Sequence, residues 1–113
     1  LKTDGWFVYH GVDSNGREWD LRKNAPHVDY KKPLRLVSVY KNDRWRKFSE
    51  NLQSDNYTFL RPLYAAYMLR KWNEMHPARP MAYLHLYYVE KTNLPGYRTT
   101  EGKKVLYCVS DGR

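Results

Sequence analysis

The stretch that decides the fold is residues 6–21, WFVYHGVDSNGREWDL, in which two apolar-rich runs flank Asn15-Gly16. An Asn-Gly pair suits a two-residue type I′ turn, because both central positions of that turn need a positive φ. The stretch therefore predicts a β-hairpin from Trp6 to Leu21, with Val12 opposite Trp19. Side chains alternate along a strand, so one largely apolar face is expected to pack on the core. That face comprises Trp6, Val8, His10, Val12, Trp19 and Leu21.

Two helices are predicted in the middle of the chain. The first is capped by Asn42 or Asp43 and ends near Gln53, with its rings on one stripe and its cations outside that stripe. The second runs from about Phe59 to Met75, and apolar residues cover much of its circumference. We expect it to be the central, most buried helix. Its apolar positions are Leu60, Tyr64, Ala65, Tyr67, Met68, Leu69, Trp72 and Met75.

Further strands are predicted after these helices. Residues 82–91 carry apolar side chains on both faces, which is typical of a central strand, and residues 103–110 predict an antiparallel neighbour. Residues 24–33 and 92–102 predict loops because of their prolines and glycines. Residues 34–40 fit either a strand or the start of the first helix, and we favour the strand.

The order of these elements indicates one α+β domain over residues 1–113. Strands that are separated from helices along a chain favour an antiparallel sheet with helices on one face. Here the sheet would consist of the N-terminal hairpin and the C-terminal strand pair, and both helices would pack on the same face.

The net charge of +8 is concentrated in one segment of the chain. Between residues 31 and 47 there are seven cations and one acid, Asp43, so this segment contributes 7 − 1 = +6. Such a cluster favours an anionic partner, although a solvated basic face is the plainer interpretation. The candidate partner-binding residues are Lys31, Lys32, Arg35, Lys41, Arg44, Arg46 and Lys47.

The sequence carries no recognisable catalytic or metal-binding motif. There is no GxSxG, HExxH, Walker A or GxGxxG pattern. Cys108 is the only cysteine, so a disulfide within the chain and a paired-cysteine metal site are both excluded, and a small core residue is expected. No stretch reaches the ~20 apolar residues that a membrane-spanning helix needs. We expect no metal ion and no cofactor.

The four histidines, His10, His27, His76 and His85, do not have the spacing of zinc ligands. His10 and His85 lie on predicted strands, where Asp20 or Glu90 can approach them. This leaves open a small enzyme that uses them for acid–base chemistry. A lone histidine on a strand is more often structural.

Five stretches occur in an order that resembles a known family: residues 4–8 (DGWFV), the hairpin return from Asn15-Gly16 to Asp20-Leu21, residues 40–48 (YKNDRWRKF), residues 70–73 (RKWN) and residues 94–96 (LPG). In this order they are similar to the C-terminal, non-membrane domain of bacterial HTTM (horizontally transferred transmembrane) proteins. Those are multi-pass membrane proteins distantly similar to vitamin K-dependent γ-carboxylase. The resemblance spans about residues 4–109, and RWRK followed by RKWN is its most specific part.

The resemblance implies a soluble accessory domain of a longer bacterial membrane protein, and a first residue other than Met fits that expectation. The γ-carboxylase chemistry belongs to the membrane-embedded part, so no catalytic residue is carried over to this chain. Two binding hypotheses remain, the first supported by the resemblance and the basic segment, the second by the basic segment alone. In the first, the domain docks on the parent's transmembrane region or on anionic lipid. In the second, it is a small basic nucleic-acid-binding module.

Overall fold

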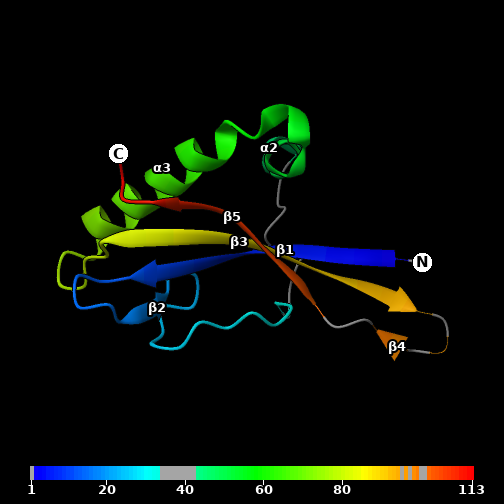
Figure 1. Cartoon of the computed structure of the whole chain (residues 1–113), viewed down its shortest axis with the longest axis horizontal. Coiled ribbons are helices and arrows are strands. Elements are labelled where there is room, and N and C mark those ends of the chain that lie inside the picture. The colour runs from blue at the N-terminus through cyan, green and yellow to red at the C-terminus, as the bar shows by residue number, and fades with distance from the viewer. Residues whose placement is uncertain (1, 34–42, 95, 97, 100–101) are drawn as a thin grey trace.

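The computed structural model describes residues 2–33, 43–94, 96, 98–99 and 102–113. Within them the chain forms an α+β fold, in which an antiparallel sheet carries two helices on one face (Figure 1). The predicted fold class is therefore confirmed. The predicted strand at residues 34–40 and the cap at Asn42 lie outside the described residues.

In the described part of the chain the sheet has five strands: β1 (Lys2–Val12), β2 (Glu18–Asp20), β3 (Tyr83–Leu94), β4 (Arg98–Thr99) and β5 (Lys103–Ser110). β1 pairs with β3 along its whole length, from Lys2 opposite Asn93 to Val12 opposite Tyr83. β2 pairs with the other edge of β1, while β5 and then β4 pair with the other edge of β3. β3 is thus the central strand, as its two apolar faces predicted.

The described residues between β2 and β3 form three helical segments: α2 (Asp43–Gln53), a 3-10 turn (Asp55–Tyr57) and α3 (Leu60–Met75). α3 packs against β3 and β5, and α2 packs against α3. The Arg61 side chain joins the helices, because its guanidinium donates to the carbonyl oxygens of Leu52 (2.7 Å) and Gln53 (3.3 Å). Among the described residues, no helix is both long enough and apolar enough to cross a membrane.

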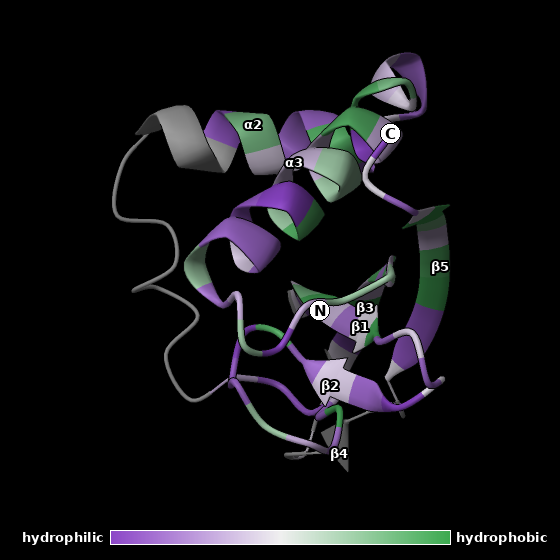
Figure 2. Ribbon diagram, turned by 90° about the vertical axis from the view of Figure 1, so that its left-hand side faces the viewer, coloured by the Kyte–Doolittle hydropathy of each residue, from purple (hydrophilic) through white to green (hydrophobic). Residues whose placement is uncertain are grey.

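The two faces of the sheet are covered differently. α2 and α3 cover one face, and the loop that follows β2 lies on the opposite side (Figures 1 and 2). The helix side holds the main core, which comprises Phe7, Tyr9, Leu52, Tyr64, Ala65, Leu69, Trp72, Met81, Leu84 and Leu86. The loop side holds a smaller cluster of Trp6, Val8 and Val89, against which Val28, Tyr30 and Tyr87 pack.

The predicted hairpin is present, but its predicted register is wrong by one residue. Val12 lies opposite Glu18 rather than Trp19. The turn is not type I′, because Gly16 has a φ of 79° whereas Asn15 does not have a positive φ. Instead, the amide of Gly16 donates to the Asp13 carbonyl (3.0 Å), and Asp13 and Arg17 close a three-residue loop.

The extra loop residue moves every side chain of β2 to the opposite face. Trp19 and Leu21 consequently pack on the helix side with Phe7 and Tyr9. The expected single face that would join them to Trp6, Val8 and His10 is therefore not formed.

Candidate functional site

The structure brings the two strand histidines together. His10 on β1 lies directly opposite His85 on β3, and their ring centroids are 5.3 Å apart. The carboxylate that contacts His10 is that of Glu18, whose Oε2 lies 3.3 Å from Nε2 of His10. Asp20 lies opposite His10 in the β1–β2 pairing, but its carboxylate accepts from amides of the following loop. Glu90 pairs with Gly5 near the other end of the strands, so it is not the partner. Sequence reasoning missed Glu18 because the predicted register placed it on the other face.

Both ring nitrogens of His10 have partners from the protein itself. The Tyr30 hydroxyl lies 3.0 Å from Nδ1, and Glu18 accepts at Nε2. Burial lowers the pKa of His10, partly opposed by the Glu18 charge, and burial raises the pKa of Tyr30 to about 12. A neutral His10 therefore accepts from Tyr30 and donates to Glu18, which leaves neither nitrogen for a substrate.

The surroundings of His10 indicate a structural role, in which it holds Tyr30 of the loop against the sheet, rather than a catalytic role. Its side chain is 18% exposed, and the Tyr87 ring stacks on it at 6.1 Å. The Lys104 ammonium lies 4.1 Å from the centre of the Tyr30 ring. The Nδ1 atom of His85 is buried and has no hydrogen-bond partner within the described part of the chain. Among the described residues, no group of three or more His, Cys, Asp or Glu side chains is arranged to hold a metal ion.

The predicted basic cluster is divided between two sides of the sheet where it is described. Lys31 and Lys32 are exposed in the loop on the loop side, where Lys32 Nζ pairs with Asp4 at 2.6 Å. Lys47 is exposed on α2, on the helix side. Arg35 and Lys41, and the side chains of Arg44 and Arg46, lie outside the described part. A flat anionic surface that contacts Lys47 from the helix side would therefore not reach Lys31 and Lys32.

Sequence reasoning also missed an exposed apolar surface on α3. The prediction that Tyr67 and Met75 belong to the buried stripe is wrong, because their side chains are 52% and 63% exposed. Phe59 and Leu63 are also exposed, at 60% and 63%. These residues follow one another at intervals of four, with Lys71 between Tyr67 and Met75, so they form a ridge along the helix. We call Phe59, Leu63, Tyr67, Lys71 and Met75 the α3 ridge.

The α3 ridge lies beside an apolar groove of about 560 Å³. Leu21, Met68 and Met75 are among its apolar lining residues, and Tyr67 forms part of its wall. Arg22 and Lys71 line it as well, and no carboxylate does among the described residues. A smaller hollow of about 300 Å³ continues past Tyr67 to Leu63 and to Phe48 of α2. The groove and hollow form one apolar surface with two cations.

Two sequence signals could have identified this surface. First, apolar residues cover more of the circumference of α3 than contact with one sheet can bury. Second, the apolar residues left over recur at every fourth position. Contiguous exposed apolar patches on folded proteins often mark interaction sites. By contrast, Cys108 is half-buried against the main core, and burial raises the pKa of its thiol, which disfavours a reactive thiolate.

Comparison with models of known protein families, with curated proteins and with solved structures found no match for this chain. The resemblance to HTTM proteins therefore stays a prediction.

Proposed function

We propose that this chain is a non-catalytic accessory domain that docks on an anionic membrane surface through the α3 ridge and the groove beside it. The observation that carries the proposal is the exposure of Phe59, Leu63, Tyr67 and Met75 along one helix. An interfacial helix inserts such a row about 5–10 Å into the boundary between head groups and acyl chains.

The charges beside the ridge favour an anionic surface over a neutral one. Lys71 lies within the ridge, and Arg22 lines the adjoining groove, where no described carboxylate opposes it. Lys47 is exposed on α2, next to Phe48 of the adjoining hollow. A Lys or Arg near an anionic membrane contributes about 1 kcal/mol, and burial of a Leu or Phe side chain contributes about 1.5–3 kcal/mol. Apolar insertion therefore dominates, and the cations select the lipid.

The resemblance to HTTM proteins adds a context for weak docking. A domain tethered to a membrane-embedded parent encounters the bilayer at a high effective concentration, so it needs little affinity of its own. In that context the domain lies in the aqueous phase beside the membrane. Docking on the parent's own transmembrane region is the competing form of the same proposal.

Sedimentation with vesicles tests the proposal. The chain should pellet with vesicles of phosphatidylglycerol and phosphatidylcholine, and it should stay in the supernatant with phosphatidylcholine alone. Leu63→Asp should weaken binding about tenfold, because it removes one inserted side chain. Leu106→Asp is the matched control, since Leu106 is an exposed leucine on β5, away from the ridge. Circular dichroism and thermal unfolding check that both variants fold.

Equal recovery in the supernatant with both vesicles at low salt would contradict lipid docking and favour a protein partner. If Leu63→Asp and Leu106→Asp weakened vesicle binding equally, α3 would not be the element that contacts the membrane. Fluorescence anisotropy with single- and double-stranded oligonucleotides tests the alternative of a nucleic-acid-binding module. That alternative requires binding that weakens steeply as salt rises.

A further inference from the structure

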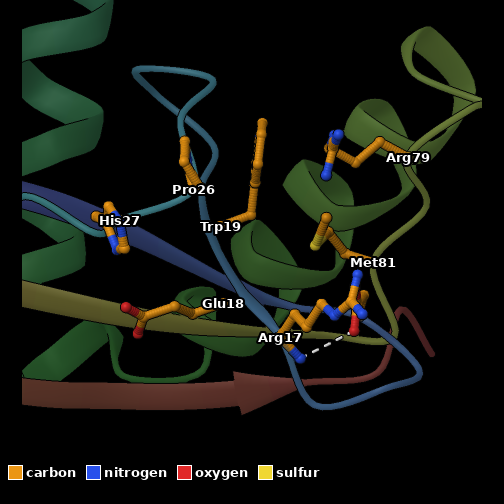
Figure 3. A pocket seen from close by; sticks show the side chains of 8 residues that line it. Arg17, Glu18, Trp19, Pro26, His27, Arg79 and Met81 are labelled. Carbon is orange, nitrogen blue, oxygen red and sulfur yellow. Dashed lines mark hydrogen bonds between the residues drawn. The ribbon is translucent and has the colours of Figure 1, made fainter.

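A pocket of about 410 Å³ lies where the β1–β2 hairpin meets the segment after α3 (Figure 3). Arg17 and Trp19 come from the hairpin, and Arg79 and Met81 come from the segment that leads to β3. The two segments are joined by a hydrogen bond from the Ala82 amide to the Val12 carbonyl, at 2.8 Å.

The walls of this pocket are fixed by hydrogen bonds to α3 and to the loop that follows β2. Trp72 Nε1 donates to the Arg79 carbonyl at 2.9 Å. The Asn73 side chain accepts from the Met81 amide at 2.8 Å and donates to its carbonyl at 3.0 Å. Trp19 Nε1 donates to Asn24 Oδ1 at 3.0 Å, which fixes the plane of the indole. The backbone that carries Arg79 is therefore held in place before any ligand binds.

Both arginines that line the pocket are drawn on the same side of the indole as Met81 (Figure 3). Arg17 and Arg79 lie on one side of Trp19, whereas Glu18 and His27 lie on the other (Figure 3). The Arg79 guanidinium lies 3.7 Å from the centre of the Trp19 ring. No described carboxylate forms an ion pair with Arg17 or Arg79.

The two described carboxylates that line the pocket, Glu18 and Asp13, have partners other than the arginine side chains. Glu18 faces the opposite side of β2 and pairs with His10. Asp13 Oδ1 accepts from the amides of Asn15 and Arg17, both at 2.9 Å, and thereby holds the turn. The half of the pocket between Arg17 and Arg79 thus carries two cations and one carboxylate, that of Asp13, so its net charge is positive although neither arginine forms an ion pair with a described carboxylate.

We propose that this half of the pocket binds a phosphate group, with Arg17 and Arg79 as its ligands. A guanidinium presents a planar fork of N–H donors that matches two phosphate oxygens, and a tetrahedral phosphate has oxygens for both arginines. The Trp19 ring restricts Arg79 to one wall of the pocket. This reduces the side-chain entropy that Arg79 loses when it binds a ligand.

The phosphate can belong to a lipid head group or to a free phosphomonoester. Trp72, whose indole holds the Arg79 carbonyl, also lines the α3 groove, and so does His76 stacked on it at 3.7 Å. A domain docked through the α3 ridge would bring this pocket close to the head groups. Only this lipid version of the inference rests on the proposed function; the phosphate site itself does not.

Titration of the isotopically labelled chain with inorganic phosphate and with sn-glycerol 3-phosphate tests the site by NMR. The Arg17 and Arg79 Nε–H signals and the Trp19 indole signal should shift together and saturate. Arg17→Gln and Arg79→Gln should each weaken binding at least tenfold. Arg113→Gln removes the same charge at a side chain that is 93% exposed and lines a different hollow, so it should not change phosphate binding. Shifts that do not saturate, or an equal loss in Arg113→Gln, would overturn the inference.

Vesicles separate the two sources of phosphate. If vesicles containing phosphatidic acid compete with sn-glycerol 3-phosphate for the wild-type chain, the head group is the ligand; if they do not, the ligand is a free phosphomonoester. The Leu63→Asp variant separates this inference from the proposed function. This variant should keep the phosphate-induced shifts while it loses vesicle binding. Loss of both would contradict the claim that the phosphate site does not depend on the α3 ridge.

Discussion

The two faces of the sheet are closed by different interactions. On the helix side, Leu84 and Leu86 are fully buried beneath α3, and packing of apolar side chains closes the face. On the loop side, polar contacts hold the covering segment: Trp6 Nε1 donates to the Tyr30 carbonyl (3.2 Å), and the Tyr30 hydroxyl bonds His10. A helix satisfies its own backbone, but a loop does not, so a face covered by a loop needs side chains that bond its amides.

The largest loss of stability should come from truncating a buried side chain on the helix side of the sheet. Leu86→Ala is expected to lower the free energy of unfolding by about 2–5 kcal/mol, because it leaves a cavity beneath α3. Leu106→Ala is the control, since Leu106 is 47% exposed on β5, and it should change stability by less than about 0.5 kcal/mol. Urea unfolding with an unchanged m value measures both changes. Similar costs for the two variants would show that the helix side is not the main core.

A smaller loss of stability is expected when the buried carboxylate that bonds the loop amides, Asp20, is replaced. Asp20 is almost fully buried, and it accepts from the amides of Arg22, Lys23 and Asp29, each at 3.0 Å. Asp20→Asn replaces one acceptor oxygen with an amide donor that faces a backbone N–H. The free energy of unfolding should fall by about 1–3 kcal/mol.

Asp29→Asn is the matched control for this substitution. Asp29 pairs with Lys23 at the surface and caps the Lys31 amide at 2.8 Å. An exposed ion pair contributes about 0–1 kcal/mol, so the control should cost less than Asp20→Asn. Chemical denaturation compares the two variants, and a larger loss for Asp29→Asn would contradict the role given to Asp20.

The contrast between the faces also explains what could be predicted from sequence. The limits of α2, α3 and β5 follow from periodicity and from turn residues, which are local signals. The predicted loop at residues 92–102 is wrong in part, because β3 continues to Leu94 and Arg98–Thr99 form β4. The register of β2 does not follow from local signals, because Asn15-Gly16 is compatible with both a two-residue and a three-residue loop. The deciding contacts are those of the Asp13 carboxylate with the Asn15 and Arg17 amides, which select the longer loop.

The candidate sites depend on the same kind of non-local information. Glu18 reaches His10 only in the observed register, and only that register places Trp19 on the helix side of the sheet, where the Arg79 guanidinium lies 3.7 Å from its ring. The α3 ridge was hidden because apolar residues at helical spacing predict burial, and only the position of the sheet shows which of them remain exposed. Aromatic and apolar composition therefore predicted the core without separating Tyr64, which is buried, from Tyr67, which is not.

The smallest expected change in stability is a pH dependence caused by His10 on the loop side. Burial lowers the pKa of His10 below its usual value of 6.5, with further effects from Glu18, His85, Lys104 and Asp20. Between the two pKa values the unfolded chain binds a proton that the folded chain does not, so stability falls as the pH drops below 6.5. Above pH 6.5 the contribution of His10 is constant.

Thermal unfolding between pH 7.5 and pH 5.5 measures this dependence. His10→Gln should flatten the decline, because the amide can still contact Tyr30 and Glu18 but does not titrate. His27→Gln is the control, since His27 is exposed in the same loop, and it should leave the slope unchanged. If stability rose as the pH fell, the charged form of His10 would be the one favoured by the fold. The contacts of His10 with Tyr30 and Glu18 would then be made by the imidazolium, and these contacts would stabilise the loop side more at acidic pH than at neutral pH.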